Sequence, residues 1–384
     1  MIIQSTRVWL ASQFLPFQIE LEGSKIKAIH SYNSKAVDKD FGDMRIVPGF
    51  IDIHIHGGYG FDTNDAYESG LINLYENLPK EGVTSFLPTT ITQSEEVLTK
   101  ALQNVAAVKE KQESGARILG VHFEGPYLNV AFKGAQPEEY IVKPDVEQFK
   151  RYQAASNNLI KLITMACEKD EDYQLMNYLS SQDIVVSLGH TGANYEEALL
   201  AVGNGAKSFT HVYNGMSRYH HRDMNVQGAS LRFHDVFGEI IVDGNHANFA
   251  AVNNYMVAKG KDKVILITDA LIGKGEPIGS EYIFGGHPIK IAENGSAYLQ
   301  DGTGSLAGST LLTNIGVKNI IEKVGLDWEY ALNAASTNPA TLLGLDNSKG
   351  YLRAGYDADI VVLQDDYNVA CTFVLGEIAY ENKE

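Results

Sequence analysis

The sequence predicts an α/β fold: a parallel (β/α)₈ barrel of the TIM type, with a small β-sandwich domain formed by both chain termini. Three observations predict it. Eight apolar runs of strand length alternate with segments of helical spacing between residues 45 and 270. Most of these runs begin apolar and end in histidine, aspartate or glutamate. Both termini are rich in β-branched and aromatic residues, and neither is long enough to bury a core alone.

The two ends of the chain read as short strands and turns. We expect residues 1–47 and 348–384 to pair into one β-sandwich domain, and residues 48–347 to form the barrel. The predicted barrel strands lie in the segments 45–56, 83–90, 116–126, 161–167, 183–190, 206–214, 238–246 and 263–270.

The segments between the runs favour helices, most clearly 94–112 and 194–205. Eight strands alternating with helices suit a parallel barrel of about 250 residues. A doubly wound open sheet is the alternative. No G-x-G-x-x-G motif opens the first unit, which argues against a dinucleotide-binding fold.

Composition excludes several classes of partner. The 384 residues carry a formal net charge of −17, which repels nucleic acid and anionic membrane surfaces but leaves room for a small anionic substrate. No apolar run approaches the roughly 20 residues of a membrane span, and the N-terminus lacks a signal-peptide pattern. Cys167 and Cys371, the only cysteines, sit in apolar surroundings. We therefore expect a reducing compartment, the cytoplasm.

The stretch PGFIDIHIHGG (48–58) places three isoleucines on one face and Asp52, His54 and His56 on the other. In a parallel barrel one strand face meets the helices and the other the interior, so inward imidazoles need partners. Active sites of such barrels lie at the carboxyl ends of the strands. The polar residues at those ends are His54, His56, His122, Glu124, His190, His211, His246 and Asp269.

Each of these residues could instead have a purely structural role: on a solvated strand face, in a buried ion pair, as a core histidine or, for Asp269, as a helix N-cap. If the site bound no metal, all of these structural roles would have to apply at the same time. Imidazole and carboxylate ligands instead suit one or two divalent metal ions, such as Zn, Fe, Co or Mn. Such a centre supports hydrolysis by an activated water, with Asp269 as the general base and acid.

The motifs PGFIDIHIHG, HFEGP, SLGHT, THVYNGM, VDGNHAN and LITDA, in this order, resemble the amidohydrolase superfamily. The closest resemblance, over essentially the whole chain, is to the N-acetylglucosamine-6-phosphate deacetylases. HFEGPYLN followed by KGAQP, and THVYNGM followed by Arg222, are its most specific stretches. The fourth run ends LITMAC, without the bridging lysine of hydantoinases, and SLGHTGANYEE lacks the H-x-x-E of adenosine-deaminase-like enzymes.

The resemblance implies a site. His54, His56, Glu124 and Asp269 would bind one metal, and Glu124, His190 and His211 a second. Asp269 would be the general base and acid. Arg222 would reach the site of a neighbouring subunit in a homodimer. Gln136 stands where some members have histidine. The implied substrate-binding residues are Ala135, Asn214, Gly215, Arg222, His246, Leu306, Ala307 and Gly308.

The expected reaction is hydrolysis of N-acetylglucosamine 6-phosphate to glucosamine 6-phosphate and acetate, in amino-sugar catabolism and recycling. One alternative is the same reaction on N-acetylgalactosamine 6-phosphate. An aminoacylase or deaminase is another, against which Arg222 and His246 argue. A non-catalytic assembly protein would be expected to have lost ligands, and all six are present.

Two further segments lie near the expected site. Segment 281–305 alternates like a hairpin and is a candidate lid. The stretch GKGEP (273–277) lacks the spacing of a P-loop, and we read it as the loop after the eighth strand.

Overall fold

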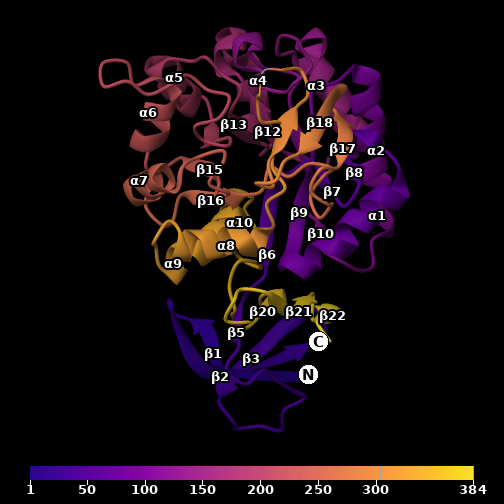
Figure 1. Ribbon diagram of the computed structural model, residues 1–384, viewed down its shortest axis with the longest axis vertical. Coiled ribbons are helices and arrows are strands. Elements are labelled where there is room, and N and C mark those ends of the chain that lie inside the picture. The colour runs from indigo at the N-terminus through magenta and orange to yellow at the C-terminus, as the bar shows by residue number, and fades with distance from the viewer. Residues whose placement is uncertain (303, 384) are drawn as a thin grey trace.

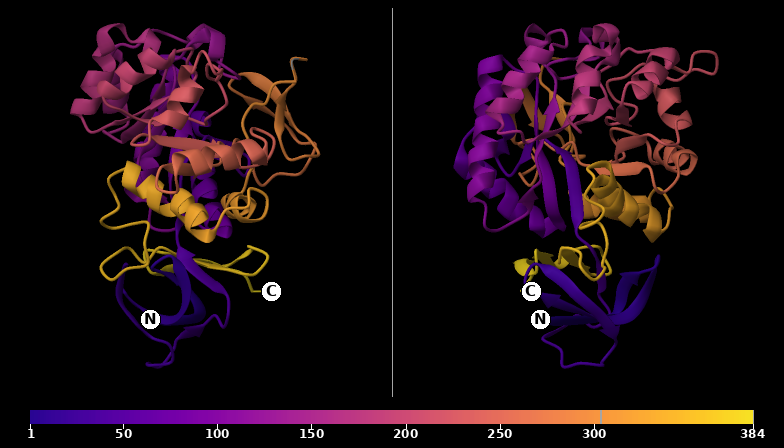
Figure 2. Two further views of the ribbon diagram at one scale, coloured as in Figure 1. Left: turned by 90° about the vertical axis from the view of Figure 1, so that its left-hand side faces the viewer. Right: turned by 180° about the vertical axis from the view of Figure 1, so that it is seen from behind.

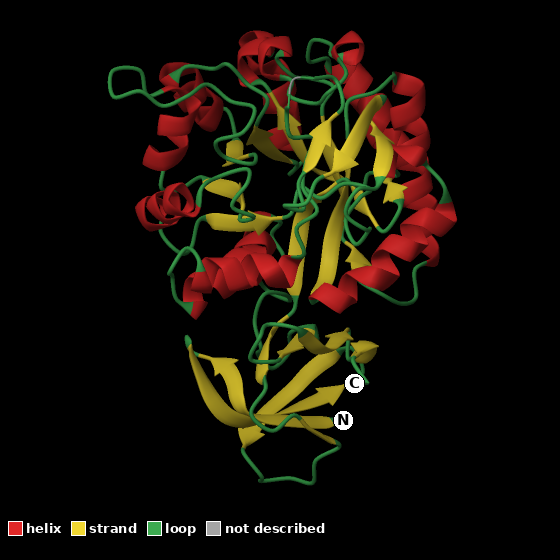
Figure 3. Cartoon of the chain, viewed as in Figure 1, coloured by secondary structure: helices red, strands yellow, loops and turns green. Residues whose placement is uncertain are grey.

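The computed structural model describes residues 1–302 and 304–383. Thr303, inside the predicted hairpin, and Glu384, the last residue of the predicted terminal domain, lie outside the described residues. A ring of helices surrounds a parallel sheet, and an all-β unit lies below it with both termini (Figures 1, 2 and 3). The predicted fold class, a barrel with a β unit made from both ends of the chain, is confirmed.

The barrel contains a strand for every predicted run, and neighbouring strands pair in parallel. The first run divides at Gly49: Arg45–Pro48 (β5) joins the terminal sheet and only Phe50–Ile55 (β6) enters the barrel. The third divides into Arg117–Ile118 (β10) and Val121–Glu124 (β11). The others are Val83–Thr90 (β9), Ile160–Met165 (β12), Val185–Leu188 (β13), Ala206–Phe209 (β14), Phe237–Ile241 (β15) and Val264–Ile267 (β16).

Closure of the barrel is incomplete between β6 and β16. At the carboxyl ends, Asp269 N donates to His54 O (2.9 Å) and His56 N donates to Ala270 O (2.8 Å). At the other end the π-helical segment Asn333–Thr337 and the start of the helix that follows it fill the space, since Ser336 Oγ donates to Gly49 O (2.5 Å) and Asn338 Nδ2 to Val264 O (2.7 Å). The sheet is therefore sealed by main-chain bonds at the end where the polar residues lie.

The helices cover the outside of the barrel (Figure 3). The segments 94–112 and 194–205, for which the sequence predicts helices most clearly, are both helical. The helices Glu95–Lys111 (α2), Val146–Ala155 (α3), Tyr195–Gly203 (α5) and Phe249–Lys259 (α7) begin at a side chain that accepts a hydrogen bond from a backbone N–H group of the first turn: Ser94, Asp145, Asn194 and Asn248. The helices are Glu68–Asn77 (α1), Glu95–Lys111 (α2), Val146–Ala155 (α3), Gln174–Ser181 (α4), Tyr195–Gly203 (α5), Asn225–Arg232 (α6), Phe249–Lys259 (α7), Thr313–Glu322 (α8), Trp328–Leu332 (α9) and Asn338–Leu342 (α10). Short 3₁₀ turns span Thr63–Asp65, Leu78–Glu81, Val130–Phe132, Glu138–Tyr140, Cys167–Lys169 and Glu171–Tyr173.

The terminal unit is one continuous sheet in the order β22-β21-β20-β5-β1-β2-β3, with β4 beside β1. Its sandwich character arises because this single sheet folds over a core of its own, in which Ile26 of β3 and Phe373 of β21 belong to the same cluster. The domain boundaries stay a prediction. The strands are Ile2–Leu10 (β1), Gln13–Glu22 (β2), Lys25–Ser31 (β3), Lys39–Asp40 (β4), Ile360–Leu363 (β20), Val369–Val374 (β21) and Glu377–Glu381 (β22).

Two small sheets lie near the carboxyl ends of the barrel strands. Gly57–Gly58 (β7) pairs with Phe61–Asp62 (β8). Glu281–Phe284 (β17), His287–Ile291 (β18) and Ala297–Leu299 (β19) form a three-stranded antiparallel sheet, so the predicted hairpin has one strand more than expected. None of the described helices is long and apolar enough to cross a membrane.

Candidate active site

The six predicted metal ligands converge at the carboxyl ends of the barrel strands. His54 lies in β6 and His56 directly after it, Glu124 ends β11, and the other three stand just after β13, β14 and β16. They form two groups whose ligand atoms lie within 4.8 Å of one another: His54, His56 and Asp269, and then Glu124, His190 and His211. Residues 215 positions apart in the sequence thus share one site.

Glu124 stands between the two groups. Its Oε2 lies 3.3 Å from His56 Nε2, while its Oε1 lies 3.5 Å from His190 Nε2 and 3.4 Å from His211 Nε2. Gln136 holds this carboxylate in place, since its Nε2 donates to Glu124 Oε2 (2.7 Å) and its Oε1 accepts from Thr92 N (2.8 Å). One carboxylate therefore faces both groups, as a bridging ligand must.

Hydrogen bonds to the far ring nitrogens set the orientation of two imidazoles. His54 Nδ1 donates to Glu239 Oε2 (3.1 Å), and His190 Nδ1 donates to Phe132 O (2.9 Å). With Nδ1 carrying the proton, each ring presents the lone pair of Nε2 to the centre of the site. These are the tautomers that metal ligation needs.

Three of the predicted ligands have positive φ angles, which residues other than glycine rarely adopt. The φ angles are +48° at His190, +29° at His211 and +48° at Asp269. Such conformations cost on the order of 1–3 kcal/mol each and concentrate at functional sites. All three residues lie just beyond a strand end, and there this backbone conformation directs each side chain toward the shared centre.

The electrostatics of the site favour a cation. Burial opposes ionisation of Glu124 and Asp269, but the surrounding histidines, His54 first, outweigh it and hold the pKa of Glu124 well below its usual value and lower that of Asp269. Burial likewise opposes a charge on His56, yet Asp269 and Glu124 raise its pKa to about 10. Two buried carboxylates thus demand positive charge, which a divalent metal supplies better than a proton.

The donor set fits a metal on a second ground. His54 Nε2 and Glu124 Oε1 are buried polar atoms with no hydrogen-bond partner among the described residues. Leaving such atoms unsatisfied is costly, and both point into the cluster. Four imidazoles and two carboxylates suit Zn, Fe, Co or Mn, and the residues present fit a centre of one or two ions.

A cavity of about 480 Å³ opens onto these ligands. It is lined by seven of the eight predicted substrate-binding residues, namely Ala135, Asn214, Gly215, His246, Leu306, Ala307 and Gly308. Arg222 is exposed and does not line this cavity; it lies on the loop between β14 and α6, which projects from the molecule (Figure 1). Arg218, four residues earlier on the same loop, lines the cavity instead.

Two glycines allow the close approaches at this cavity. A Cβ atom on Gly215, at φ +56°, would stand 2.9 Å from His190 Nδ1, and one on Gly308, at φ +113°, would stand 3.0 Å from Asp269 O. The loop with Leu306–Gly308 is tied to the site because Ser309 N donates to Asp269 O (2.8 Å). Phe284 of β17 also lines the cavity, with its ring 5.4 Å from that of His56, so the segment predicted as a lid contributes to the cavity wall.

Sequence reasoning missed three residues of the site: Glu239, Gln136 and Arg218. Glu239 is a lone acid in the apolar run GEIIV, a signal that was visible but unassigned. Gln136 was noted only as a departure from the family pattern. Asp52 and His122 prove to be supports: Asp52 accepts from Thr268 Oγ1 (2.5 Å), and His122 Nε2 bonds to Thr164 Oγ1 (2.8 Å).

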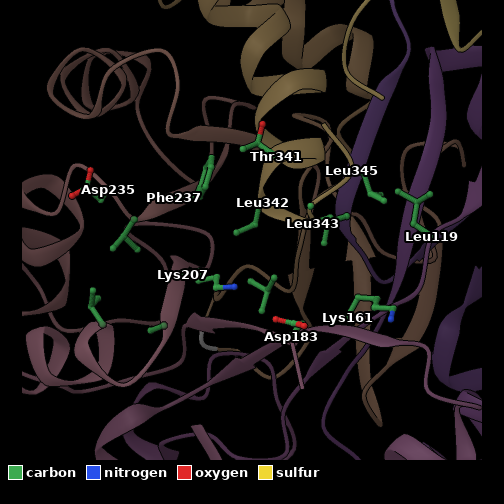
Figure 4. Close-up of a pocket in the computed structure, with 15 residues that line it drawn as sticks. Leu119, Lys161, Asp183, Lys207, Asp235, Phe237, Thr341, Leu342, Leu343 and Leu345 are labelled. Carbon is green, nitrogen blue, oxygen red and sulfur yellow. The ribbon is translucent and has the colours of Figure 1, made fainter. Parts of the chain in front are cut away.

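A further cavity, of about 550 Å³, lies at the opposite end of the barrel, because residues at the starts of the strands, such as Lys161, Val185 and Ala206, line it. Apolar residues such as Phe237 and Leu342 line it, with charged Lys161, Asp183 and Lys207 among them (Figure 4). Both groups of potential metal ligands found in the described part of the chain lie at the other end. We therefore assign the chemistry to the cavity above the strand ends.

Comparisons with known proteins agree with this geometry. The model of the amidohydrolase family matches residues 45–379. The chain is 43% identical to the N-acetylglucosamine-6-phosphate deacetylase of Bacillus subtilis, covering 89% of this chain and 86% of that protein, and 32% identical to the N-acetylgalactosamine-6-phosphate deacetylase of Escherichia coli O157:H7, covering 94% of each.

A solved structure gives the same picture. It is a point mutant of the N-acetyl-D-glucosamine-6-phosphate deacetylase of Mycobacterium smegmatis in complex with N-acetyl-D-glucosamine-6-phosphate. The two chains superpose with a TM-score of 0.93 at 27% identity, covering 99% of each. With a family match over most of its length, and with relatives of this kind aligned almost end to end, the chain belongs to the amidohydrolase family, within the group that these deacetylases form.

Proposed function

We propose that the protein is a metal-dependent deacetylase that hydrolyses N-acetylglucosamine 6-phosphate to glucosamine 6-phosphate and acetate, in amino-sugar catabolism and recycling. The observation that carries the proposal is the pair of ligand groups bridged by Glu124 at the floor of the cavity. The relatives named for this reaction support the choice of substrate.

The chain's own residues have separate tasks in this reaction. A bound divalent metal would polarise the acetamide carbonyl and lower the pKa of water. Asp269 accepts a proton from the attacking water and returns it to the departing amine. Asp243 accepts a hydrogen bond from His246 Nδ1 (2.7 Å), which orients that imidazole and leaves its Nε2 for the sugar phosphate. Leu306–Gly308 and Phe284 limit the access of bulk water.

Acetate release from three sugars tests this proposal. We expect fast turnover of N-acetylglucosamine 6-phosphate, and slow turnover of unphosphorylated N-acetylglucosamine because it lacks the anion. A coupled acetate assay with purified, metal-loaded protein measures the turnover of all three sugars. Fast turnover of the unphosphorylated sugar would remove the phosphate from the proposal. Preference for N-acetylgalactosamine 6-phosphate would favour the alternative, to which the Escherichia coli relative points.

The phosphate needs a cation, and we assign that role within the subunit to Arg218. Among the described residues that line the cavity, it is the only lysine or arginine. Arg222 could meet the substrate only in the site of a second subunit, because in its own chain it lies outside the cavity. That arrangement, and the homodimer it requires, stay a prediction from the resemblance.

Substituting the two arginines separates these roles. We expect Arg218→Ala to raise KM for the phosphorylated sugar about ten- to a hundredfold, with little change in kcat. An increase of this size corresponds to the loss of one hydrogen bond to a charged group. Arg222→Ala is the matched control on the same loop. An increase in KM confined to Arg222→Ala, together with a dimer in solution, would contradict the assignment of Arg218 and support the shared site.

We place the enzyme in the cytoplasm, a reducing compartment to which its two buried free cysteines, Cys167 and Cys371, are suited.

A further inference from the structure

Glu239 is an unusual residue for the middle of a barrel strand. It lies on β15 and its side chain is completely buried. Its Oε2 is 3.1 Å from His54 Nδ1, while its Oε1 has no hydrogen-bond partner among the described residues. His54 is also its only ion-pair partner in the described part of the chain. Burying a carboxylate without a lysine or arginine beside it costs free energy of folding, so we expect a function to require Glu239 at this position.

The reason lies on the other side of the imidazole. A carboxylate that accepts the Nδ1 proton of a histidine raises the basicity of Nε2 and fixes the ring for a metal. His54 Nε2 is buried, without a hydrogen-bond partner among the described residues, and 3.4 Å from Asp269 Oδ1. Glu239 therefore places negative charge directly behind the group formed by His54, His56 and Asp269.

The second ligand group has no such support. His190 Nδ1 donates to the neutral carbonyl of Phe132 (2.9 Å), and His211 Nδ1 has no partner among the described residues. The two halves of the centre thus differ in a specific way. One is backed by a carboxylate, and the other by a main-chain dipole.

We propose that Glu239 is the positioning residue that makes the centre binuclear, by raising through His54 the affinity of the His54–His56–Asp269 group for a divalent cation. The inference rests on the metal-dependent function proposed above and deepens it, since it names the residue that promotes metal binding at the first site. The second site, at Glu124, His190 and His211, keeps its metal without Glu239.

Titration of metal-free protein with Co²⁺ or Zn²⁺ tests this proposal, with no substrate present. We expect the wild type to bind two ions per chain. In Glu239→Leu the affinity of one site falls about 10- to 100-fold, the usual effect of losing such a support, while the other site is unchanged. Glu239→Gln keeps an acceptor oxygen for His54 and loses the charge, so we expect a smaller fall at the same site.

Thermal unfolding adds a readout that a merely structural role would not move. We expect the rise of Tm on adding metal to shrink in both Glu239 variants, while the Tm of the metal-free protein stays close to that of the wild type. Ser208→Ala is the matched control. Its hydroxyl is buried on the adjacent strand β14 without a partner among the described residues, and its loss should leave both sites unchanged.

Three outcomes would overturn the inference: two ions bound with wild-type affinity in Glu239→Leu and Glu239→Gln, an equal loss of Tm with and without metal, or a wild type that binds one ion only. The deacetylase proposal is judged separately by acetate release. A wild type that binds two ions but releases no acetate would refute that function and leave the role of Glu239 standing.

Discussion

Asp269→Asn is expected to lower kcat for acetate release about 10²- to 10⁴-fold, the usual contribution of a general acid–base. Asparagine has nearly the shape of aspartate and can still present an oxygen, but it accepts no proton from water and returns none to the amine. Its main-chain bonds, Asp269 N to His54 O and Ser309 N to Asp269 O, do not depend on the side chain, so the loop geometry should persist. KM should therefore change far less than kcat.

The control for this prediction must separate proton transfer from metal binding, because Asp269 belongs to a ligand group. Elemental analysis of each preparation gives the metal content, and activity is compared at equal occupancy. Asp235→Asn, an exposed carboxylate at the opposite end of the barrel, should leave kcat unchanged. An Asp269→Asn enzyme that holds its metals and turns over at near the wild-type rate would show that another group moves the proton.

The fold was predictable because strand and helix periodicity are local properties. Each of the eight runs became a strand, and both helices predicted with most weight start at a capping side chain. Where one element ends and another begins was less predictable. The sequence of run 45–56 has no break that separates two strands, and the pairing of β5 with β1 and β20 shows that the run serves two units.

The convergence of the six predicted metal ligands was predictable for a related reason, since parallel strands bring their carboxyl ends to one place and these residues stand at or next to those ends. The supports were not predictable in the same way. Glu239 and His54 lie 185 positions apart, and their contact depends on which residues of two strands face inward at the same height. The choice between Arg218 and Arg222 depends on the path of a loop, which has no periodicity to read.

Lys274 shows how a suggestive motif can mislead. In GKGEP it resembles part of a phosphate-binding loop, but its side chain is fully buried and its Nζ lies 2.8 Å from Glu81 Oε2. Glu81 also accepts hydrogen bonds from Thr313 N (2.6 Å) and Tyr59 Oη (3.1 Å). The pair ties the loop after β16 to α8 and to the turn that follows α1, close to the strand end that carries Asp269.

Lys274→Met should therefore destabilise the protein strongly, by about 3–5 kcal/mol, because it leaves the buried carboxylate of Glu81 without its cation. Denaturant unfolding of wild type and variant measures the difference. The double variant Glu81→Gln/Lys274→Met should recover much of the loss, since glutamine can still accept from Thr313 N and no charge remains buried. Lys100→Met, the same change at an exposed pair with Glu96, should have little measurable effect. If Lys274→Met were as stable as the wild type but raised KM for the sugar phosphate, Lys274 would be a substrate residue and not a structural one.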